Sequence, residues 1–402
     1  MSEPLIDSLP PMQSNPGGDL SPRDVVGRDL FIDQLWRRLK SQSVLLNAER
    51  RIGKTQVIKK MCSMPAAGWK PIYQNFEAVG SPENFAELVY DEIQGHLGTG
   101  KRALNWVQRF LEENTAKYKD FELGLKERSW QELIKSAMDN LLADKKAGNE
   151  RVVFLWDEVP FMLQNILRGE HGIERTNTLL SFIRSLSDKF PDLRVILTGS
   201  IGIHHIINQL NKAKIAAGPL NKFYSTSMEP ISPAWGEALA HALIRGENLK
   251  FPDIRAAARA ISGSVDHFPY YIHNVVARWK DDQRTGGAPE IRAFVQEQLV
   301  AANDPWNIKH FRERILTYYP DPKEQQLAYE ILNALAHDGR NDDPPSPFSL
   351  AEIQNSVKSG PELQDLRTMM EKLENDHYLK RNPAGEYLFR FPLIRRWWRL
   401  HA

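Results

Sequence analysis

The chain opens with a stretch in which apolar residues show no periodicity. Residues 1–21 hold four prolines and an adjacent pair of glycines, a composition that breaks helices and strands. Farther along, Leu30, Leu35 and Leu39 recur at helical spacing and predict a first amphipathic helix. The pattern therefore predicts a flexible arm ahead of a folded region.

Short apolar runs separated by helix-patterned sequence follow this first helix. Four of them predict strands, at 43–46, 71–76, 152–156 and 195–198, and a weaker fifth lies at 223–228. Near-continuous apolar runs are typical of parallel strands that are covered on both faces. Alternation of such strands with helices is typical of an open α/β sheet. After the second strand, we expect Ser81 to cap the next helix.

Strand signals stop after Pro230. Amphipathic stretches rich in alanine follow, such as 235–244 and 254–261, and predict a helical domain. Near the end the pattern gives a helix at 324–336, a short helix introduced by Ser349, a longer helix at 361–376 and a hairpin around 382–385. Helix, helix, helix and hairpin is the order of a winged helix. The expected domains are an arm (1–21), an α/β core (22–232), a helical lid (233–318) and a winged helix (319–402).

Composition and charge exclude several classes of protein. The 402 residues hold 52 Lys and Arg against 51 Asp and Glu, for a net charge of +1, so no overall field attracts a polyanion and any such binding must be local. The one cysteine, Cys62, fits a reducing compartment. No run approaches the roughly 18 apolar residues of a membrane span. With no basic residue before Arg23, we also expect no signal peptide and a cytoplasmic protein.

The segment between the first strand and the next helix carries the most informative motif. It consists of Ala48, Glu49, Arg50, Arg51, Ile52, Gly53, Lys54, Thr55 and Gln56. Strand, loop and helix is the context of a phosphate-binding loop, in which inward backbone N–H groups and a helix N-terminus hold the phosphates. We expect Lys54 to reach the β- and γ-phosphates and the Thr55 hydroxyl to bind Mg²⁺. Ala48 replaces the first glycine of the motif, which favours binding over efficient hydrolysis.

Two further strands end in residues suited to the same site. Asp157 and Glu158 follow the run 153–156, and a carboxylate at the end of a neighbouring parallel strand would lie beside the phosphates. We expect Asp157 to hold the Mg²⁺ shell and Glu158 to orient or deprotonate water; the plain alternative is a strand that ends in an acidic turn. Ser200, in Thr198-Gly199-Ser200 after the next strand, would sense the γ-phosphate.

With these elements in order, and Gly27, Arg28 and Asp29 before the first helix, the chain resembles the AAA+-related STAND ATPases of prokaryotes, specifically the archaeal-type ATPase family. The resemblance implies an AAA+/STAND-like α/β P-loop NTPase fold with ATP and Mg²⁺ as cofactors. It places Gly27, Arg28 and Asp29 near the adenine. It also implies a lid motif around Pro269, although His267 stands where the family usually has a glycine. An oligomeric AAA+ motor also needs an arginine finger from a neighbouring subunit. None of the arginines between the third and fourth strands of this chain follows such a motif.

The expected function is an ATP-binding switch with slow hydrolysis that controls a protein partner or a second copy of the chain. The resemblance adds a context of signalling or defence against phage. The alternative is a DNA-binding initiator or transposition-type regulator, because arginines surround Trp397 and Trp398 near the C-terminus. Against it, the helix in the recognition position is acidic. A third hypothesis is a scaffold that has lost nucleotide binding.

Overall fold

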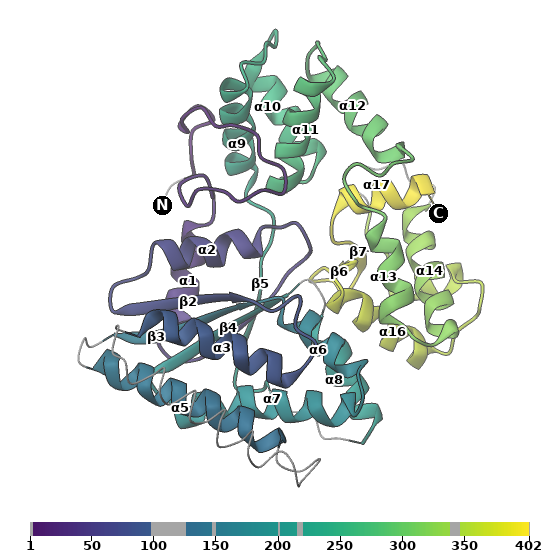
Figure 1. Ribbon diagram of the computed structural model, residues 1–402. Helices are drawn as coiled ribbons and strands as arrows, with labels where there is room; N and C mark the ends of the chain where they lie inside the picture. The colour runs from purple at the N-terminus through teal and green to yellow at the C-terminus, as the bar shows by residue number, and fades with distance from the viewer. Residues whose placement is uncertain are drawn as a thin grey trace. The chain divides into compact units, whose positions relative to one another are not determined.

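The computed structural model describes residues 3–97, 126–146, 150–199, 202–214, 220–337 and 346–401 (Figure 1). Ser200 lies outside these residues. The chain divides into two compact units. Unit 1 comprises residues 1–30, 48–53 and 228–402, and unit 2 comprises residues 31–47 and 54–227. Within the described ranges, no helix is both long enough and apolar enough to cross a lipid bilayer.

Unit 2 is built on a parallel sheet of five strands (Figure 1). The strands are β1 (Val44–Asn47), β2 (Trp69–Asn75), β3 (Arg151–Asp157), β4 (Leu193–Gly199) and β5 (Tyr224–Ser227). All five predicted strands are confirmed. Their order is β2-β3-β4-β1-β5, so β4 separates β3 from β1. The expectation that the acidic strand directly neighbours the first strand is therefore wrong, because the chain places the later strand β4 between them.

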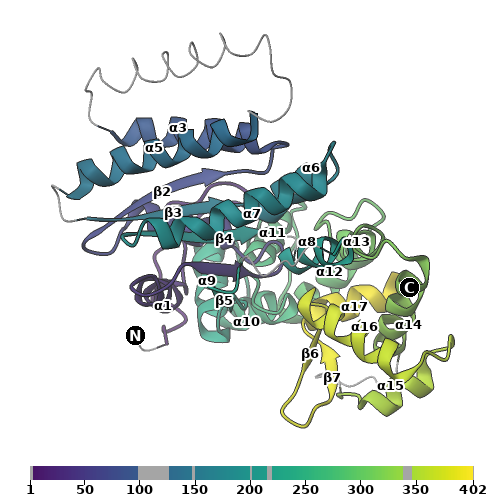
Figure 2. The same cartoon turned by 90° about the horizontal axis from the view of Figure 1, so that it is seen from below.

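Helices cover both faces of this sheet. They are α1 (Asp29–Leu39), α2 (Lys54–Ser63), α3 (Pro82–His96), α5 (Lys126–Lys146), α6 (Val159–Leu167), α7 (Gly172–Lys189) and α8 (Ile203–Lys212). Helix α2 packs on β2, β3 and β4, while α3 and α5 lie side by side on the opposite face (Figure 2). The Ser81 hydroxyl accepts a hydrogen bond from the Asn84 N–H, so the predicted cap of α3 is confirmed.

Alternate residues of the strands supply the core beneath α3 and α5. Phe154 and Trp156 on β3 point to the same face because side chains alternate along a strand, and both are buried. The ring of Trp156 meets Phe76 and Phe85 edge-on at centroid distances of 5.7 and 5.2 Å. Since Asp157 follows Trp156 directly, this aromatic packing fixes the end of β3 where the acidic pair begins.

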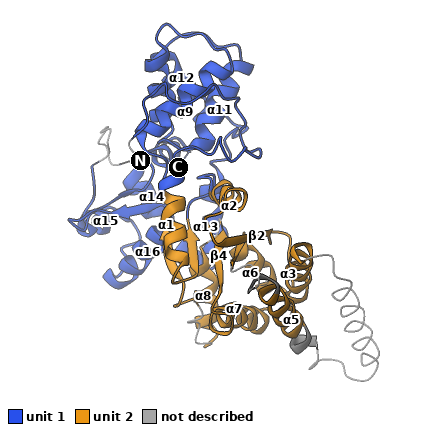
Figure 3. Ribbon diagram, turned by 90° about the vertical axis from the view of Figure 1, so that its left-hand side faces the viewer, with its two compact units in different colours: residues 1–30, 48–53, 228–402 blue, residues 31–47, 54–227 orange. Residues whose placement is uncertain are grey.

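Unit 1 is mostly helical (blue in Figure 3). Its helices are α9 (Pro233–Gly246), α10 (Ile254–Ser264), α11 (Pro269–Asp281), α12 (Ala288–Val300), α13 (His310–Tyr318), α14 (Pro322–Ala336), α15 (Leu350–Ser356), α16 (Leu363–Asn375) and α17 (Pro392–His401). Strands β6 (Leu379–Arg381) and β7 (Tyr387–Phe389) form the expected hairpin. The predicted helices and the Ser349 cap are confirmed. Helix α17 was not predicted. The domain boundaries and the winged helix stay predictions.

The described part of the expected arm, residues 3–21, forms no helix or strand. It nevertheless makes specific contacts inside unit 1. The Met12 N–H donates to the Ala242 carbonyl over 3.0 Å, and the Met12 side chain is buried. The Ser14 N–H donates to the Glu247 carboxylate over 2.6 Å. The composition that breaks regular structure thus leaves backbone groups that hydrogen-bond to the helices of this unit.

Candidate functional site

Asp157 is the centre of a polar cluster at the carboxyl end of the sheet in unit 2. Its side chain is fully buried. One carboxylate oxygen accepts a 2.6 Å hydrogen bond from the Thr55 hydroxyl. The other accepts hydrogen bonds from the Thr198 hydroxyl and, over 3.1 Å, from the Glu158 N–H. A buried carboxylate needs such donors because desolvation of its charge is costly.

The side chains at this cluster fit a magnesium ion. Mg²⁺ prefers hard oxygen ligands and is commonly held by one or two carboxylates or hydroxyls together with substrate phosphates and water. Thr55 and Asp157 offer a hydroxyl and a carboxylate that already lie within hydrogen-bond distance of each other. The structure therefore brings together the two residues that the sequence predicts as metal ligands, at the first turn of α2 and the end of β3.

Lys54 is the first residue of α2 and is 6% exposed. Thr55 and Gln56 follow it in the first turn and are half-buried. The N–H groups of a first helical turn lack partners inside the helix and carry partial positive charge, which favours an anion at this end. The predicted lysine therefore starts a helix whose N-terminus is suited to phosphate.

Glu158 directly follows Asp157 and adopts a left-handed backbone conformation, with φ 57° and ψ 31°. This conformation costs an L-residue other than glycine roughly 1 kcal/mol or more. Strained backbone of this kind clusters at functional sites. The strained residue thus directly adjoins the buried carboxylate at the end of β3.

Thr198 was not among the predicted site residues, although it was part of the segment that the sequence singled out. The prediction chose Ser200, which is outside the described residues. The structure instead gives Thr198 a hydrogen bond to the Asp157 carboxylate. The position of Thr198 in the sequence could have indicated this role. Thr198 on β4 and Asp157 on β3 both lie at the carboxyl ends of parallel strands, which meet at one edge of the sheet.

The loop Ala48–Gly53 belongs to unit 1, and the boundary between the units falls at the peptide bond between Gly53 and Lys54. Left-handed backbone occurs at Arg51 (φ 66°) and Gly53 (φ 101°) but not at Ala48. Gly53 faces open space, since an added Cβ would meet no atom within 4 Å. The alanine that replaces the first glycine of the motif therefore causes no backbone strain.

Arg28 holds this loop from the segment before α1. Its guanidinium donates to the Ile52 carbonyl over 2.8 Å and to the Glu229 carbonyl over 2.6 Å. Burial lowers the pKa of Arg28 to about 10, and the negative charge of Glu229 partly opposes this. Gly27 beside it has φ 69°, and a Cβ there would come within 2.9 Å of the Trp235 ring. Asp29, on the other side of Arg28, begins α1. Through its hydrogen bonds to the Ile52 and Glu229 carbonyls, the Arg28 guanidinium stabilises the conformation of the loop.

The predicted lid motif also contacts the loop within unit 1. Pro269 is the first residue of α11, and the guanidinium of Arg51 lies over the ring of the next residue, Tyr270, 4.2 Å from its centroid. His267 has φ 59° and hydrogen-bonds Ser262 over 2.8 Å. A histidine therefore adopts the left-handed conformation at the position where the family usually has glycine.

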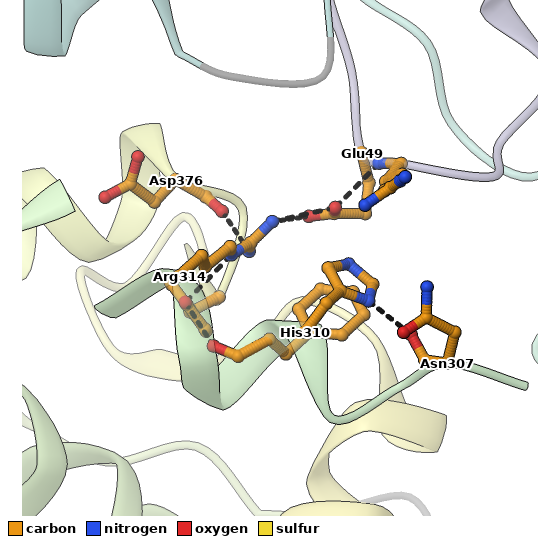
Figure 4. A network of polar contacts seen from close by, with 8 residues as sticks. Glu49, Asn307, His310, Arg314 and Asp376 are labelled. Atoms are coloured by element: carbon orange, nitrogen blue, oxygen red, sulfur yellow. Dashed lines mark hydrogen bonds and ion pairs between the residues drawn. The ribbon is translucent and has the colours of Figure 1, made fainter. Parts of the chain in front are cut away.

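Glu49 forms a buried ion pair that sequence reasoning missed (Figure 4). Its carboxylate accepts two hydrogen bonds from one nitrogen of Arg314 on α13, over 2.8 and 3.1 Å. Burial alone would lower the pKa of Arg314, but the charge of Glu49 and its hydrogen bond, together with Tyr318 and Tyr378, outweigh burial and raise it. Glu49 was expected to contribute to nucleotide binding, yet its side chain is directed to Arg314. No local pattern marks a partner 265 positions away.

The basic residues near the C-terminus bind protein groups. Arg390 pairs with Glu229, Arg395 donates to the Leu335 carbonyl over 3.2 Å, and Arg396 donates to the Ser264 carbonyl over 2.5 Å. Trp397 and Trp398 are buried. Lys380 and Arg381 on β6 are exposed. Most of this segment therefore serves packing inside unit 1.

No family model matches the chain, and no curated protein matches it significantly. Among solved structures, a Walker-type ATPase of Pyrococcus abyssi is similar over 98% of this chain and 99% of its own length, with a TM-score of 0.61 and 15% identity. The ORC2 protein of Aeropyrum pernix, in its ADPNP-ADP complexes, is similar over 94% of this chain and 93% of its own, with a TM-score of 0.53 and 11% identity. At these identities the likeness concerns the fold. Together with the parallel sheet, it shows that this chain has an α/β P-loop NTPase fold.

Proposed function

We propose that the protein is an ATP-binding switch that hydrolyses ATP slowly and changes conformation with its nucleotide state. The observation that carries this proposal is the buried Asp157 carboxylate, which lies between the hydroxyls of Thr55 and Thr198. Thr55 follows Lys54 at the start of α2. A lysine, a hydroxyl and a carboxylate in this arrangement are the groups that a Mg²⁺-nucleotide requires.

Each predicted residue has a role in this proposal. The backbone of loop 48–53 and Lys54 bind the phosphates, Thr55 and Asp157 hold the metal, and Glu158 orients the attacking water. Gly27, Arg28, Asp29 and Pro269 belong to the proposed adenine side, where Arg28 acts by holding the loop carbonyl of Ile52. A bound Mg²⁺ ion would neutralise phosphate charge. The similarity in fold to a structure with bound ADPNP and ADP supports the choice of an adenine nucleotide.

The output of the switch is proposed to be the C-terminal region, 319–402, acting as a winged helix that docks a protein partner or a second copy of the chain. Helix α16 favours protein over DNA as the partner, because its exposed residues include Asp365 and Glu371. An acidic helix is unsuited to the major groove. A role in signalling or phage defence in the cytoplasm follows from the resemblance to STAND ATPases.

The proposal is tested by titrating the full chain with ATP and with GTP in the presence of Mg²⁺, followed by limited proteolysis with and without nucleotide. We expect ATP to bind with micromolar or tighter affinity and to change the pattern of cleavage. Binding without any change in cleavage or in hydrodynamic radius would contradict the switch. An absence of ATP binding would contradict the whole proposal and favour a scaffold that has lost nucleotide.

The alternative, a DNA-binding regulator, depends on the exposed Lys380 and Arg381 of the hairpin. The internal pairing of Arg390, Arg395 and Arg396 weighs against it. A measurement of duplex binding between 50 and 200 mM salt separates the two functions. About four to six phosphate contacts would give a slope of several units in a log-log plot, and a flat, weak signal is expected for a protein-docking module.

A further inference from the structure

The phosphate loop already contains an anion of its own. The carboxylate of Glu49 accepts a 2.6 Å hydrogen bond from the backbone N–H of Arg50, the next residue of the loop. Glu49 is 1% exposed. A loop that binds phosphate does so with backbone N–H groups. At least one such donor is therefore occupied by a carboxylate that belongs to the chain.

Arg314 holds this carboxylate in place (Figure 4). One guanidinium nitrogen donates to both Glu49 oxygens, the Nε donates to the Tyr378 hydroxyl over 2.8 Å, and the other terminal nitrogen donates to the Asp376 carbonyl over 2.7 Å. Because all three nitrogens are engaged, the guanidinium has one defined orientation. The loop is thereby connected to α13 and to the segment that precedes β6.

The partners of Arg314 are themselves fixed. The Tyr378 hydroxyl donates to the Phe311 carbonyl over 2.5 Å, and the Tyr319 hydroxyl donates to the Asp376 carboxylate. Arg314, Tyr319 and Tyr378 are all buried. A fully satisfied buried network of this kind rigidifies the residues that form it. It is thus suited to transmit a change at the loop to the residues around Tyr378.

A carboxylate and a phosphate compete for the same donors. If a nucleotide phosphate approaches the loop while Glu49 keeps its position, two anions repel each other at short range in a poorly solvated site. The arginine that neutralises Glu49 is equally suited to attract the phosphate. Nucleotide binding and the Glu49–Arg314 pair are therefore expected to oppose each other.

We propose that the Glu49–Arg314 pair is an autoinhibitory latch. It occupies the phosphate loop with an internal anion and ties the loop to α13 and the segment 376–378, and bound nucleotide releases it. The proposal rests on the proposed nucleotide binding and adds to it the residue pair that links the loop to the C-terminal region. By linkage, any partner that separates Arg314 from Glu49 strengthens nucleotide binding.

The first test compares Glu49→Gln with the wild-type chain, with the non-hydrolysable analogue ADPNP and Mg²⁺ as the probe. Glutamine retains an acceptor for the Arg50 N–H but removes the competing charge. We expect the variant to bind ADPNP at least tenfold more tightly. The matched control is Glu247→Gln, which removes another buried carboxylate of unit 1, one that pairs with Lys280 over 2.6 Å. The control should leave the affinity unchanged, and an affinity of Glu49→Gln equal to or weaker than that of the wild type overturns the latch.

The second test needs no variant, so it holds even if Glu49→Gln fails to fold. Hydrogen exchange of the wild-type chain is measured with and without ADPNP in peptides that cover 311–319 and 373–380. The latch predicts faster exchange in both segments when ADPNP is bound. If ADPNP binds but exchange there stays the same, the latch is wrong and the proposed nucleotide binding stands. If ADPNP does not bind at all, both proposals are wrong.

Discussion

The Thr55 hydroxyl lies 2.6 Å from the Asp157 carboxylate, although the two residues are 102 positions apart. The contact exists because α2 begins directly after the loop that follows β1, while Asp157 ends β3. In a parallel sheet these points lie at the same edge. The sequence separation is large, yet the fold makes the two residues one site.

Replacement of Asp157 by Asn should weaken nucleotide binding only when Mg²⁺ is present. The asparagine amide is similar in size to the carboxylate, but it lacks the negative charge that binds Mg²⁺. We expect a loss of about 10- to 100-fold in affinity for ATP with Mg²⁺ and less than a threefold change in EDTA. Calorimetric titration measures both values. The control is Asp188→Asn, which removes an exposed carboxylate of unit 2 that pairs with Lys222. Equal losses with and without Mg²⁺ would mean that Asp157 does not act through a metal.

Two replacements of Glu158 should separate its effect on ATP turnover from its effect on the free energy of unfolding. Replacement by Gln removes the base and should lower ATP turnover about 100-fold or more while ATP affinity is retained. Replacement by Gly also removes the base, but it relieves the left-handed backbone at φ 57° and should raise the free energy of unfolding by about 1 kcal/mol relative to Gln. Phosphate release and urea denaturation measure the two effects. Wild-type turnover in the Gln variant would remove Glu158 from the catalytic proposal.

Gly27 should not tolerate even the smallest side chain. Its φ of 69° disfavours an L-residue, and a Cβ would lie 2.9 Å from the Trp235 ring. We expect Gly27→Ala to lower the free energy of unfolding by about 2 kcal/mol and to weaken ATP binding, because Arg28 follows it. Gly263→Ala on α10 is the matched control. No atom lies near its added Cβ, so it should stabilise the chain slightly. Similar melting temperatures for the two variants would contradict this interpretation.

Acid should destabilise the protein through His273. This residue is 3% exposed, its Nδ1 accepts a hydrogen bond from the Asn15 N–H over 3.1 Å, and burial lowers its pKa to about 4 from an ordinary value near 6.5. Between these two pH values the unfolded chain binds more protons than the folded chain, so stability falls as the pH falls from about 6.5 to 4. The shift corresponds to about 3 kcal/mol.

Denaturation at several pH values checks this expectation, with His273→Gln as the variant and the exposed His171→Gln as the control. The His273 variant should have a shallower pH dependence than the wild type. Some dependence should remain, because burial also lowers the pKa of His310 to about 4. A slope identical to that of the wild type would show that His273 is not the group that titrates.

The sequence was sufficient where the chemistry is local. Short apolar runs predicted all five strands, and the positions of Thr55 and Asp157 beside them predicted two residues that the fold brings together. The sequence was insufficient where the partner is distant. The order of strands in a sheet depends on where each later strand is inserted among the earlier ones. The apolar runs in the sequence therefore could not predict that β4 lies between β1 and β3.

The same reason explains the missed residues. Arg314 stands in an amphipathic stretch with no motif, and only the fold brings it to Glu49. Helix α17 was missed because its arginines and tryptophans were weighed as a binding segment against packing and not by their period, whereas Leu393, Ile394, Trp397 and Trp398 recur at helical spacing and are buried. A pattern of basic and aromatic residues does not distinguish a surface from a core when the residues around it are unknown.

If the loop before Thr55 binds a triphosphate through Lys54, removal of this side chain must weaken nucleotide binding. The affinity of the full chain for Mg²⁺-ATP is therefore measured in the wild type and in Lys54→Ala. The control is Lys59→Ala, which removes another lysine of α2. The ammonium of Lys59 lies over the Tyr73 ring, and Lys59 has no proposed role in phosphate binding. We expect tight binding by the wild type and by Lys59→Ala and a loss of at least about 100-fold in Lys54→Ala. Undiminished affinity in Lys54→Ala would contradict triphosphate binding through Lys54.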